Sequence, residues 1–363
     1  MGWPISPTDS AAITAALAKP NYIPAGVTQA FLEENRDLAP VQTIIFVGVV
    51  VTITLLLRCY ARGVLRKDFK LDDWLAVTTM LPYTAFITLS IILIRLGSGR
   101  HIQYIQYILP NPTINGTEVL DFVAHILYTC ALLLCRLSGL AFYWRFADRT
   151  PWMQRSIKSA WVFFCGVFLC QLMFLIFHCL PVTGYWPYAW QVEESARYTC
   201  LAWGTVYVTN SGLSLVCDVL LFSIPATLIV RLQKRSMMKK LRLSLLLLPG
   251  TFVIAISIVR IDLVIRGQYD PDQSWVYSPF LAVENSEVGS TLFALSVPAL
   301  KPLFNDLFSK YSPRSPTDMD YTRESNTPRS SDRVWRPHSA EGSAAGSAAS
   351  IEMKGYHDYA RVV

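Results

Sequence analysis

Seven apolar blocks of about 20 residues divide the sequence, and their length limits what the chain can fold into. A helix rises 1.5 Å per residue, so about 20 residues cross a hydrocarbon core about 30 Å thick. Hydrophobic residues make up 52% of the chain and charged residues 16%, against about 25% charged in ordinary soluble domains. We therefore predict an all-α membrane protein, a bundle of seven transmembrane helices. The blocks are Leu38–Leu57, Trp74–Ile94, Val119–Trp144, Ile157–Leu180, Gly204–Val230, Leu243–Ile265 and Val276–Leu300.

The basic residues of the connecting loops predict the orientation, because Lys and Arg accumulate on the cytoplasmic side of a membrane. The first, third and fifth loops are basic, and the fifth has six such residues: Arg231, Lys234, Arg235, Lys239, Lys240 and Arg242. We therefore expect an extracellular segment at 1–37, a seven-helix domain at 38–304 and a disordered cytoplasmic tail at 305–363. The tail is rich in Ser, Arg, Pro and Gly, a composition that cannot bury a core.

Two features of the predicted outer loops agree with this orientation. Asn115 begins the sequon Asn115-Gly116-Thr117 in the second loop, which predicts a glycosylation site. Cys179 and Cys200 lie at the two ends of the fourth loop, where an oxidising compartment permits a disulfide between them. Two free thiols are the alternative, and we favour the bridge.

Charged residues inside the apolar blocks indicate where helices face one another, because a charge in a membrane is costly and usually pairs. Arg136 lies about 25 Å along the third helix and Asp218 about 21 Å along the fifth, so we expect a buried ion pair. Arg260 on the sixth helix is expected to pair with Glu284 or Glu287 on the seventh. One hypothesis is an outer cavity for a ligand or ion, with wall residues Glu284, Glu287, Arg260, Asp262 and His125. The alternative is that these charges only hold the helices together.

The sequence contains no constellation of residues typical of catalysis, a metal site or a cofactor. Retinal binding needs a lysine within a span for the Schiff base. Lys301 instead follows the seventh block at its cytoplasmic end. We therefore expect no enzyme activity, no retinal or other cofactor, no metal and no nucleic-acid partner.

An ordered set of short motifs over about 41–308 resembles the fungal "rhodopsin domain" family of seven-span membrane proteins. The matching pieces are Arg58-Cys59-Tyr60-Ala61-Arg62, Leu71-Asp72-Asp73-Trp74, Arg136-Leu137-Ser138, Cys179-Leu180-Pro181 with Trp186 and Cys200, Asp218, Pro225, Glu284-Asn285-Ser286-Glu287, and Pro298-Ala299-Leu300-Lys301-Pro302. The chain differs from the pattern in having Arg136 where lysine is as frequent. Its amino-terminal segment has no cysteine, so we expect no eight-cysteine CFEM domain. The family includes receptor-like proteins and members linked to secondary-metabolite clusters.

The leading functional hypothesis is a receptor-like protein of the plasma membrane that senses an external small molecule and signals through its inner loops. The basic fifth loop would contact a cytosolic signalling protein, although positive-inside anchoring to the lipid bilayer alone also explains it. The second hypothesis is a metabolite or proton-coupled transporter that uses Glu284 and Glu287. The third is a membrane scaffold without a ligand.

Overall fold

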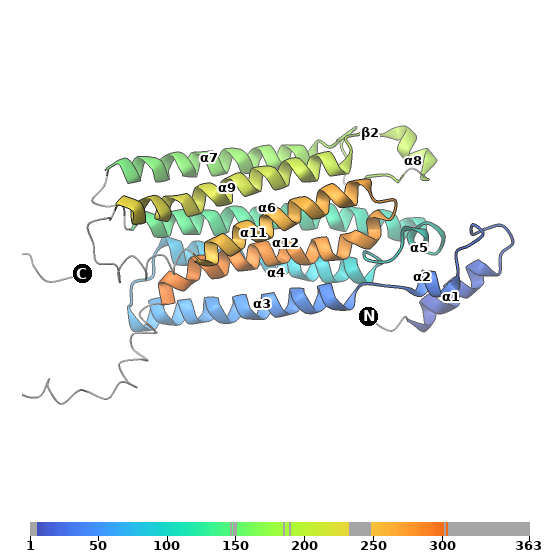
Figure 1. Cartoon of the computed structure of the whole chain (residues 1–363), viewed down its shortest axis with the longest axis horizontal. Coiled ribbons are helices and arrows are strands. Elements are labelled where there is room, and N and C mark those ends of the chain that lie inside the picture. Colours follow the sequence, from blue (N-terminus) through green and yellow to red (C-terminus); the bar gives the residue numbers. More distant parts are fainter. Residues whose placement is uncertain are drawn as a thin grey trace, which may run out of the picture. The chain divides into compact units, whose positions relative to one another are not determined.

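Seven long helices lie side by side in one bundle in the computed structural model, which describes residues 6–145, 147, 151–183, 186–188, 190–231, 248–300 and 303 (Figure 1). They are α3 (Leu38–Cys59), α4 (Leu71–Arg95), α6 (Asn111–Trp144), α7 (Pro151–Ile176), α9 (Trp203–Arg231), α11 (Leu248–Tyr269) and α12 (Gln273–Ser296). Helices form here because hydrocarbon offers no hydrogen-bond partner, so a spanning backbone must satisfy its own polar groups. Most of the basic fifth loop and the predicted tail from 305 onward lie outside the described residues.

Six of these helices are long and apolar enough to cross a membrane, among the residues that the structure describes. The helix that does not qualify is α12, which corresponds to the predicted seventh span. It is long enough, with 24 residues, but it includes Glu284, Asn285 and Glu287 and several serines. These polar side chains lower its apolarity below that of its neighbours.

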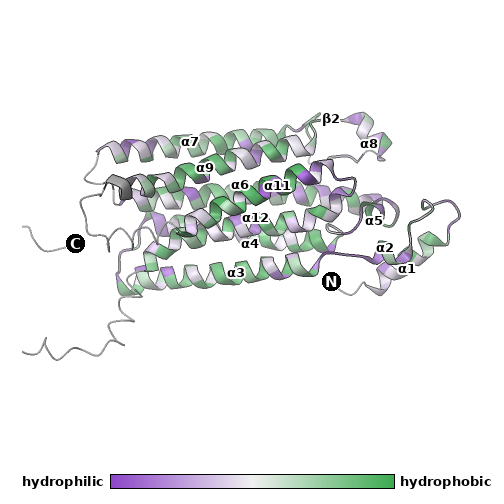
Figure 2. Cartoon of the chain, viewed as in Figure 1, coloured by the Kyte–Doolittle hydropathy of each residue, from purple (hydrophilic) through white to green (hydrophobic). Residues whose placement is uncertain are grey.

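The outward faces of the bundle are apolar, as expected for contact with lipid. The side chains of Phe46, Leu81 and Val162 are 68%, 79% and 76% exposed. Figure 2 shows hydrophobic residues along the long helices and hydrophilic ones in the connections. Water would penalise so much exposed apolar surface, so lipid is the solvent that this surface fits.

Four short helices and a small sheet lie at the end of the bundle where α3 begins, which we call the Leu38 end. Here α1 (Pro7–Leu17) and α2 (Gln29–Glu33) precede α3, and α5 (Ile102–Tyr107) follows α4. Between α7 and α9 lie β1 (Cys179–Leu180), α8 (Val192–Arg197) and β2 (Thr199–Cys200), and the two strands pair antiparallel. Cys179 is directly opposite Cys200 in this register and the two form a disulfide, which confirms the predicted bridge.

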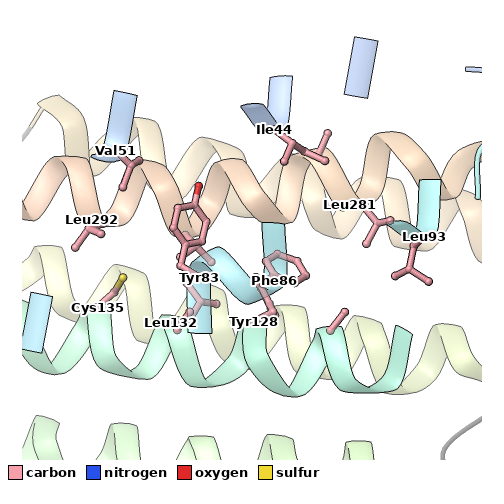
Figure 3. Close-up of a cluster of buried hydrophobic side chains, with 14 of the residues drawn as sticks. Ile44, Val51, Tyr83, Phe86, Leu93, Tyr128, Leu132, Cys135, Leu281 and Leu292 are labelled. Atoms are coloured by element: carbon pink, nitrogen blue, oxygen red, sulfur yellow. The ribbon is translucent and has the colours of Figure 1, made fainter. Parts of the chain in front are cut away.

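The largest cluster of buried hydrophobic side chains in the described bundle lies between α3, α4, α6 and α12. Figure 3 shows side chains of these four helices meeting, among them Ile44, Phe86, Leu132 and Leu292. The rings of Phe86 and Tyr128 pack with centroids 5.5 Å apart. At the opposite end, which we call the Cys59 end, α3 continues into the π-helix η1 (Tyr60–Leu65), and α12 into the 3-10 helix η2 (Val297–Leu300).

One helix begins earlier than the sequence indicated. We predicted a loop up to Val119, but α6 begins at Asn111 with Pro112 in its first turn. Proline is favoured there because its missing N–H would have no helical partner. Asn115 therefore lies within a helix, half-buried, and its Oδ1 accepts a hydrogen bond from Gln191 Nε2 at 3.1 Å. Glycosylation of Asn115 remains a prediction.

Candidate functional site

A chain of buried polar side chains runs through the bundle between α6, α9, α11 and α12, and Glu287 of α12 lies at its centre. Glu287 Oε2 lies 2.7 Å from Arg260 Nη1 and accepts a hydrogen bond from the Tyr128 hydroxyl at 2.8 Å. Its other oxygen accepts from Ser257 Oγ at 3.1 Å. Glu287 is fully buried and Arg260 is 1% exposed. The guanidinium of Arg260 also lies over the Tyr128 ring, 5.2 Å from its centroid.

The structure brings Arg136 of α6 and Asp218 of α9 together. Arg136 Nε donates to Asp218 Oδ1 at 3.0 Å, and the two side chains are 4% and 0% exposed. Ser257 Oγ is 3.1 Å from Asp218 Oδ2 and also reaches Glu287. This serine therefore links the two ion pairs into one network.

His125 of α6 connects a third carboxylate to this part of the bundle. Its Nε2 lies 3.3 Å from Glu284 Oε2, and its Nδ1 lies 3.4 Å from Asp121 Oδ1. The Tyr207 hydroxyl donates to Asp121 Oδ2 at 3.1 Å, and the Tyr277 hydroxyl donates to Asp121 Oδ1. Asp121 thus connects α6 to α9 and α12. His125 lies between Asp121 and Glu284 and contacts both.

A small space lies between these groups. It has a volume of about 20 Å³ and is lined by residues that include His125, Arg260, Glu284 and Asn210. A space of about 10–15 Å³ holds one water molecule when polar groups surround it. Arg260 Nε and Asn210 Oδ1 are buried without a hydrogen-bond partner among the described residues. A bound water would satisfy such groups.

A much larger cavity of about 450 Å³ opens at the Leu38 end. Glu118 and Asp121 of α6, Trp203 and Tyr207 of α9, and Tyr277 of α12 line it. Residues of the connection between β1 and β2, Trp186 and Tyr188 among them, line it too. Its size falls within the range of small-molecule sites, about 300–1,000 Å³. Asp121 and Tyr207 belong both to this cavity and to the buried polar chain, so a ligand here would contact the network directly.

None of the five residues predicted to line an outer cavity lines the cavity of about 450 Å³; His125, Arg260 and Glu284 line the space of about 20 Å³ instead. Asp262 lines neither, so its predicted place on a cavity wall is wrong. Its side chain is 51% exposed and pairs with Arg266 on the same helix, with Oδ2 2.8 Å from the guanidinium Nε. Arg260, two residues earlier, points into the bundle, because a two-residue step turns a helix by about 200°. Of the two expected partners, Glu287 rather than Glu284 pairs with Arg260.

The sequence did not single out the carboxylates that line the larger cavity, among them Glu118 and Asp121 of α6. Both lie near the Leu38 end of α6. Glu118 was assigned to the preceding loop, where a carboxylate gives no sign of burial, and Asp121 is only two residues inside the predicted block. Their spacing of three residues places them on one helix face, and this spacing is the sequence signal that points to them.

A second ion-pair cluster at the Cys59 end explains two of the motifs. Arg58 Nε donates to Asp73 Oδ1 at 2.9 Å, and its Nη2 donates to Asp72 Oδ2 at 3.1 Å. Arg145 Nη1, after α6, donates to Asp72 Oδ1 at 3.1 Å. The buried guanidinium and carboxylates thus join the ends of α3, α4 and α6, so these charges hold helices together.

Comparison with known families agrees with this architecture. The model of the fungal rhodopsin domain matches residues 57–306, which is more than half of the chain. The chain belongs to this family. The match begins just before the Arg58 motif and ends just after the described residues of η2, so it contains both ion-pair clusters. As a fungal rhodopsin domain protein, the chain is a multi-pass membrane protein, which confirms the resemblance found from its motifs.

A curated relative supports the same placement. A SAT4 family membrane protein of Emericella nidulans is 26% identical over 214 residues, which cover 58% of this chain and 51% of the relative. The chain thus spans about half the length of the curated relative it matches. No solved structure matches the chain.

Proposed function

We propose that this fungal rhodopsin domain protein is a receptor-like sensor of an external small molecule, without retinal and without enzyme activity. The observation that carries the proposal is the cavity of about 450 Å³ at the Leu38 end, joined through Asp121 to the buried polar chain. Cavities of this size between helices commonly bind small molecules.

The buried polar chain offers a route for a signal. A ligand shifts a conformational equilibrium only if it binds one arrangement better than another. A ligand that competes for Asp121 would change its bonds to Tyr207 and Tyr277, which belong to α9 and α12. These helices also carry Asp218 and Glu287, so a changed packing would reach the two central ion pairs. A cytosolic partner would read that change at the basic inner loops.

The proposal includes the topology. All seven long helices cross the plasma membrane, with the Leu38 end outside and the tail inside. The exposed apolar faces and the basic residues of the odd loops support this arrangement. Helix α12 crosses as well because its polar side chains face the bundle interior, where lipid does not reach them.

Cysteine labelling tests the topology and the access to the cavity. Thr117→Cys lines the cavity, whereas Arg66→Cys is exposed at the Cys59 end. In a background without the six free cysteines, a membrane-impermeant thiol reagent added to intact cells should label Thr117→Cys alone. Permeabilisation should expose Arg66→Cys. Labelling of Arg66→Cys in intact cells would contradict the proposal.

A proton-coupled transporter is the second candidate, because His125 and Glu284 pair in a buried position beside the 20 Å³ space. Purified protein in liposomes under an imposed pH gradient separates the two functions. A receptor gives no protein-dependent proton flux, measured with a trapped pH dye. A transporter gives a flux that Glu284→Gln abolishes and Glu193→Gln, on exposed α8, retains.

A further inference from the structure

We propose that the cavity at the Leu38 end binds an organic cation, an amine with an aromatic or bulky apolar group, and that Glu118 supplies the counter-charge. This inference rests on the proposed sensing function of the same cavity and names the chemical class of its ligand.

The lining of the cavity is acidic and aromatic. Among the described residues, no Lys, Arg or His lines it. Its carboxylates are Glu118, Asp121 and Asp270, and its aromatic residues are Trp186, Tyr188, Trp190, Trp203, Tyr207 and Tyr277. An anionic ligand would find no basic partner on these walls. A cation would meet both carboxylates and the electron-rich faces of aromatic rings, which attract it when it lies within about 6 Å.

Glu118 is the group that most needs a partner. Both of its carboxylate oxygens are buried, and neither has a hydrogen-bond partner among the described residues. Asp121 differs, because two tyrosine hydroxyls and His125 surround it. A buried carboxylate without a partner is costly, and a positively charged ligand would supply the missing hydrogen bonds and charge.

The charge balance of the surrounding network points the same way. Arg136 offsets Asp218, and Arg260 offsets Glu287. The remaining basic group is His125, which is charged only when protonated and lies beside both Asp121 and Glu284. Even with Glu118 uncharged, the four other carboxylates of this region outnumber its three basic groups when His125 is protonated. The field in the cavity is therefore negative, and it favours a cation over a neutral molecule of the same shape.

The aromatic wall indicates an apolar group on the ligand. The rings of Tyr188 and Trp190 stack with centroids 4.3 Å apart, and Trp203 and Tyr207 meet edge to face at 5.9 Å. Leu93, Ile105 and Leu109 line another part of the cavity. A metal ion or ammonium alone would leave this apolar surface and most of the 450 Å³ unused.

Three probes of matched shape test the inference: phenethylamine, 2-phenylethanol and phenylacetate. Each probe has a phenyl ring on a short chain. Phenethylamine is positively charged, 2-phenylethanol is neutral and phenylacetate is negatively charged. Binding to the full chain in lipid nanodiscs is followed by tryptophan fluorescence, since Trp186, Trp190 and Trp203 line the cavity. We expect phenethylamine to bind at least tenfold more tightly than 2-phenylethanol, and phenylacetate to bind most weakly.

Two variants locate the site. Glu118→Gln should reduce phenethylamine affinity at least tenfold and leave 2-phenylethanol affinity nearly unchanged. Glu193→Gln, an exposed carboxylate on α8, is the matched control and should change neither. Because Glu118 loses no hydrogen bond that the described part of the chain makes, its variant should fold. Trp190→Phe, which keeps an aromatic ring, is a second variant, and it should weaken binding of the amine.

The outcomes separate this inference from the proposed function. Equal or tighter binding of the alcohol or the acid overturns the cation assignment and leaves a ligand-sensing cavity. An amine preference that survives Glu118→Gln unchanged overturns the role of Glu118. Amine binding with the expected charge preference, accompanied by saturable uptake of the amine into liposomes, supports the ligand class and contradicts the receptor.

Discussion

Neutralising Asp218 should destabilise the bundle strongly, because it leaves the guanidinium of Arg136 buried without its ion-pair partner. The side chains of this pair are 4% and 0% exposed, and Glu287, the other nearby carboxylate, is already paired with Arg260. Removing one partner of a buried ion pair costs about 3–5 kcal/mol. At about 2–4 °C per kcal/mol for a chain of this order of size, Asp218→Asn should lower the unfolding midpoint by about 6–20 °C.

The assay is thermal unfolding in detergent with a thiol-reactive fluorescent dye. Cys135 and Cys217 are buried at 0% and 1% exposure, so the dye reacts with them as the bundle opens. The matched control is Asp262→Asn, which breaks the ion pair with Arg266 on the surface of α11. That pair is 51% and 75% exposed. Exposed pairs contribute about 0–1 kcal/mol, so the midpoint should change by no more than about 4 °C.

A double variant tests the cause. Arg136→Met with Asp218→Leu removes both charges and keeps apolar volume, so it should be more stable than Asp218→Asn alone. The reasoning fails if Asp218→Asn shifts the midpoint no more than Asp262→Asn does. It also fails if the double variant is as unstable as the sum of the two single changes, because the charges would then act independently.

Three further predictions concern stability. Cys179→Ser removes a disulfide that joins residues 21 apart, which should lower the free energy of unfolding by about 2–4 kcal/mol. A reducing agent should lower the thermal unfolding midpoint of the natural chain and leave that of the variant unchanged. Gly289→Ala should cost about 1–3 kcal/mol by overpacking, since its new methyl group would clash with Val47 and lie 2.9 Å from the Tyr83 hydroxyl. The new methyl group of Gly166→Ala would meet no described atom within 4 Å, so that variant should be neutral or stabilising. Burial raises the pKa of Asp37, just before α3, to about 6, although Arg100 lowers it. Its stabilising contribution is complete below about pH 4 and is lost as the pH rises through about 6. Asp37→Asn should therefore raise the midpoint at pH 7 relative to the natural chain and bring no gain at pH 4; an equal gain at both pH values would contradict this.

The helices could be predicted because the length of an apolar block and its lack of charge are both properties of consecutive residues. The disulfide followed from the loop position of Cys179 and Cys200 in the same way. The approach of Arg136 to Asp218 could be estimated from depth along two helices, since both depend on a constant rise per residue. Depth fixes only one coordinate, however. Asp262 lies at nearly the same depth as Arg260, and its rotation around α11 sends it to the surface.

The larger cavity could not be predicted in this way, because part of its wall comes from a segment with no regular period. Trp186 and Tyr188 belong to an irregular connection, and their position depends on the disulfide and on packing against α9. Glu118 lies where the sequence indicated a loop, and there a carboxylate is ordinary. Only the assembled bundle shows that its oxygens are buried among aromatic rings.

Helix α12 is the least apolar of the long helices, and it carries Glu287 at the centre of the buried polar chain. Fifteen of its 24 residues are buried, and it packs against α3, α4, α6 and α11. A helix so surrounded has little contact with lipid, so its polar side chains cost little if neighbouring helices provide partners. Arg260, Tyr128 and Ser257 provide them for Glu287, and Ser90 does so for Asn285. The same side chains that lower the apolarity of α12 therefore fix its rotation in the bundle, and this rotation places Tyr277 at the cavity and Glu284 beside His125.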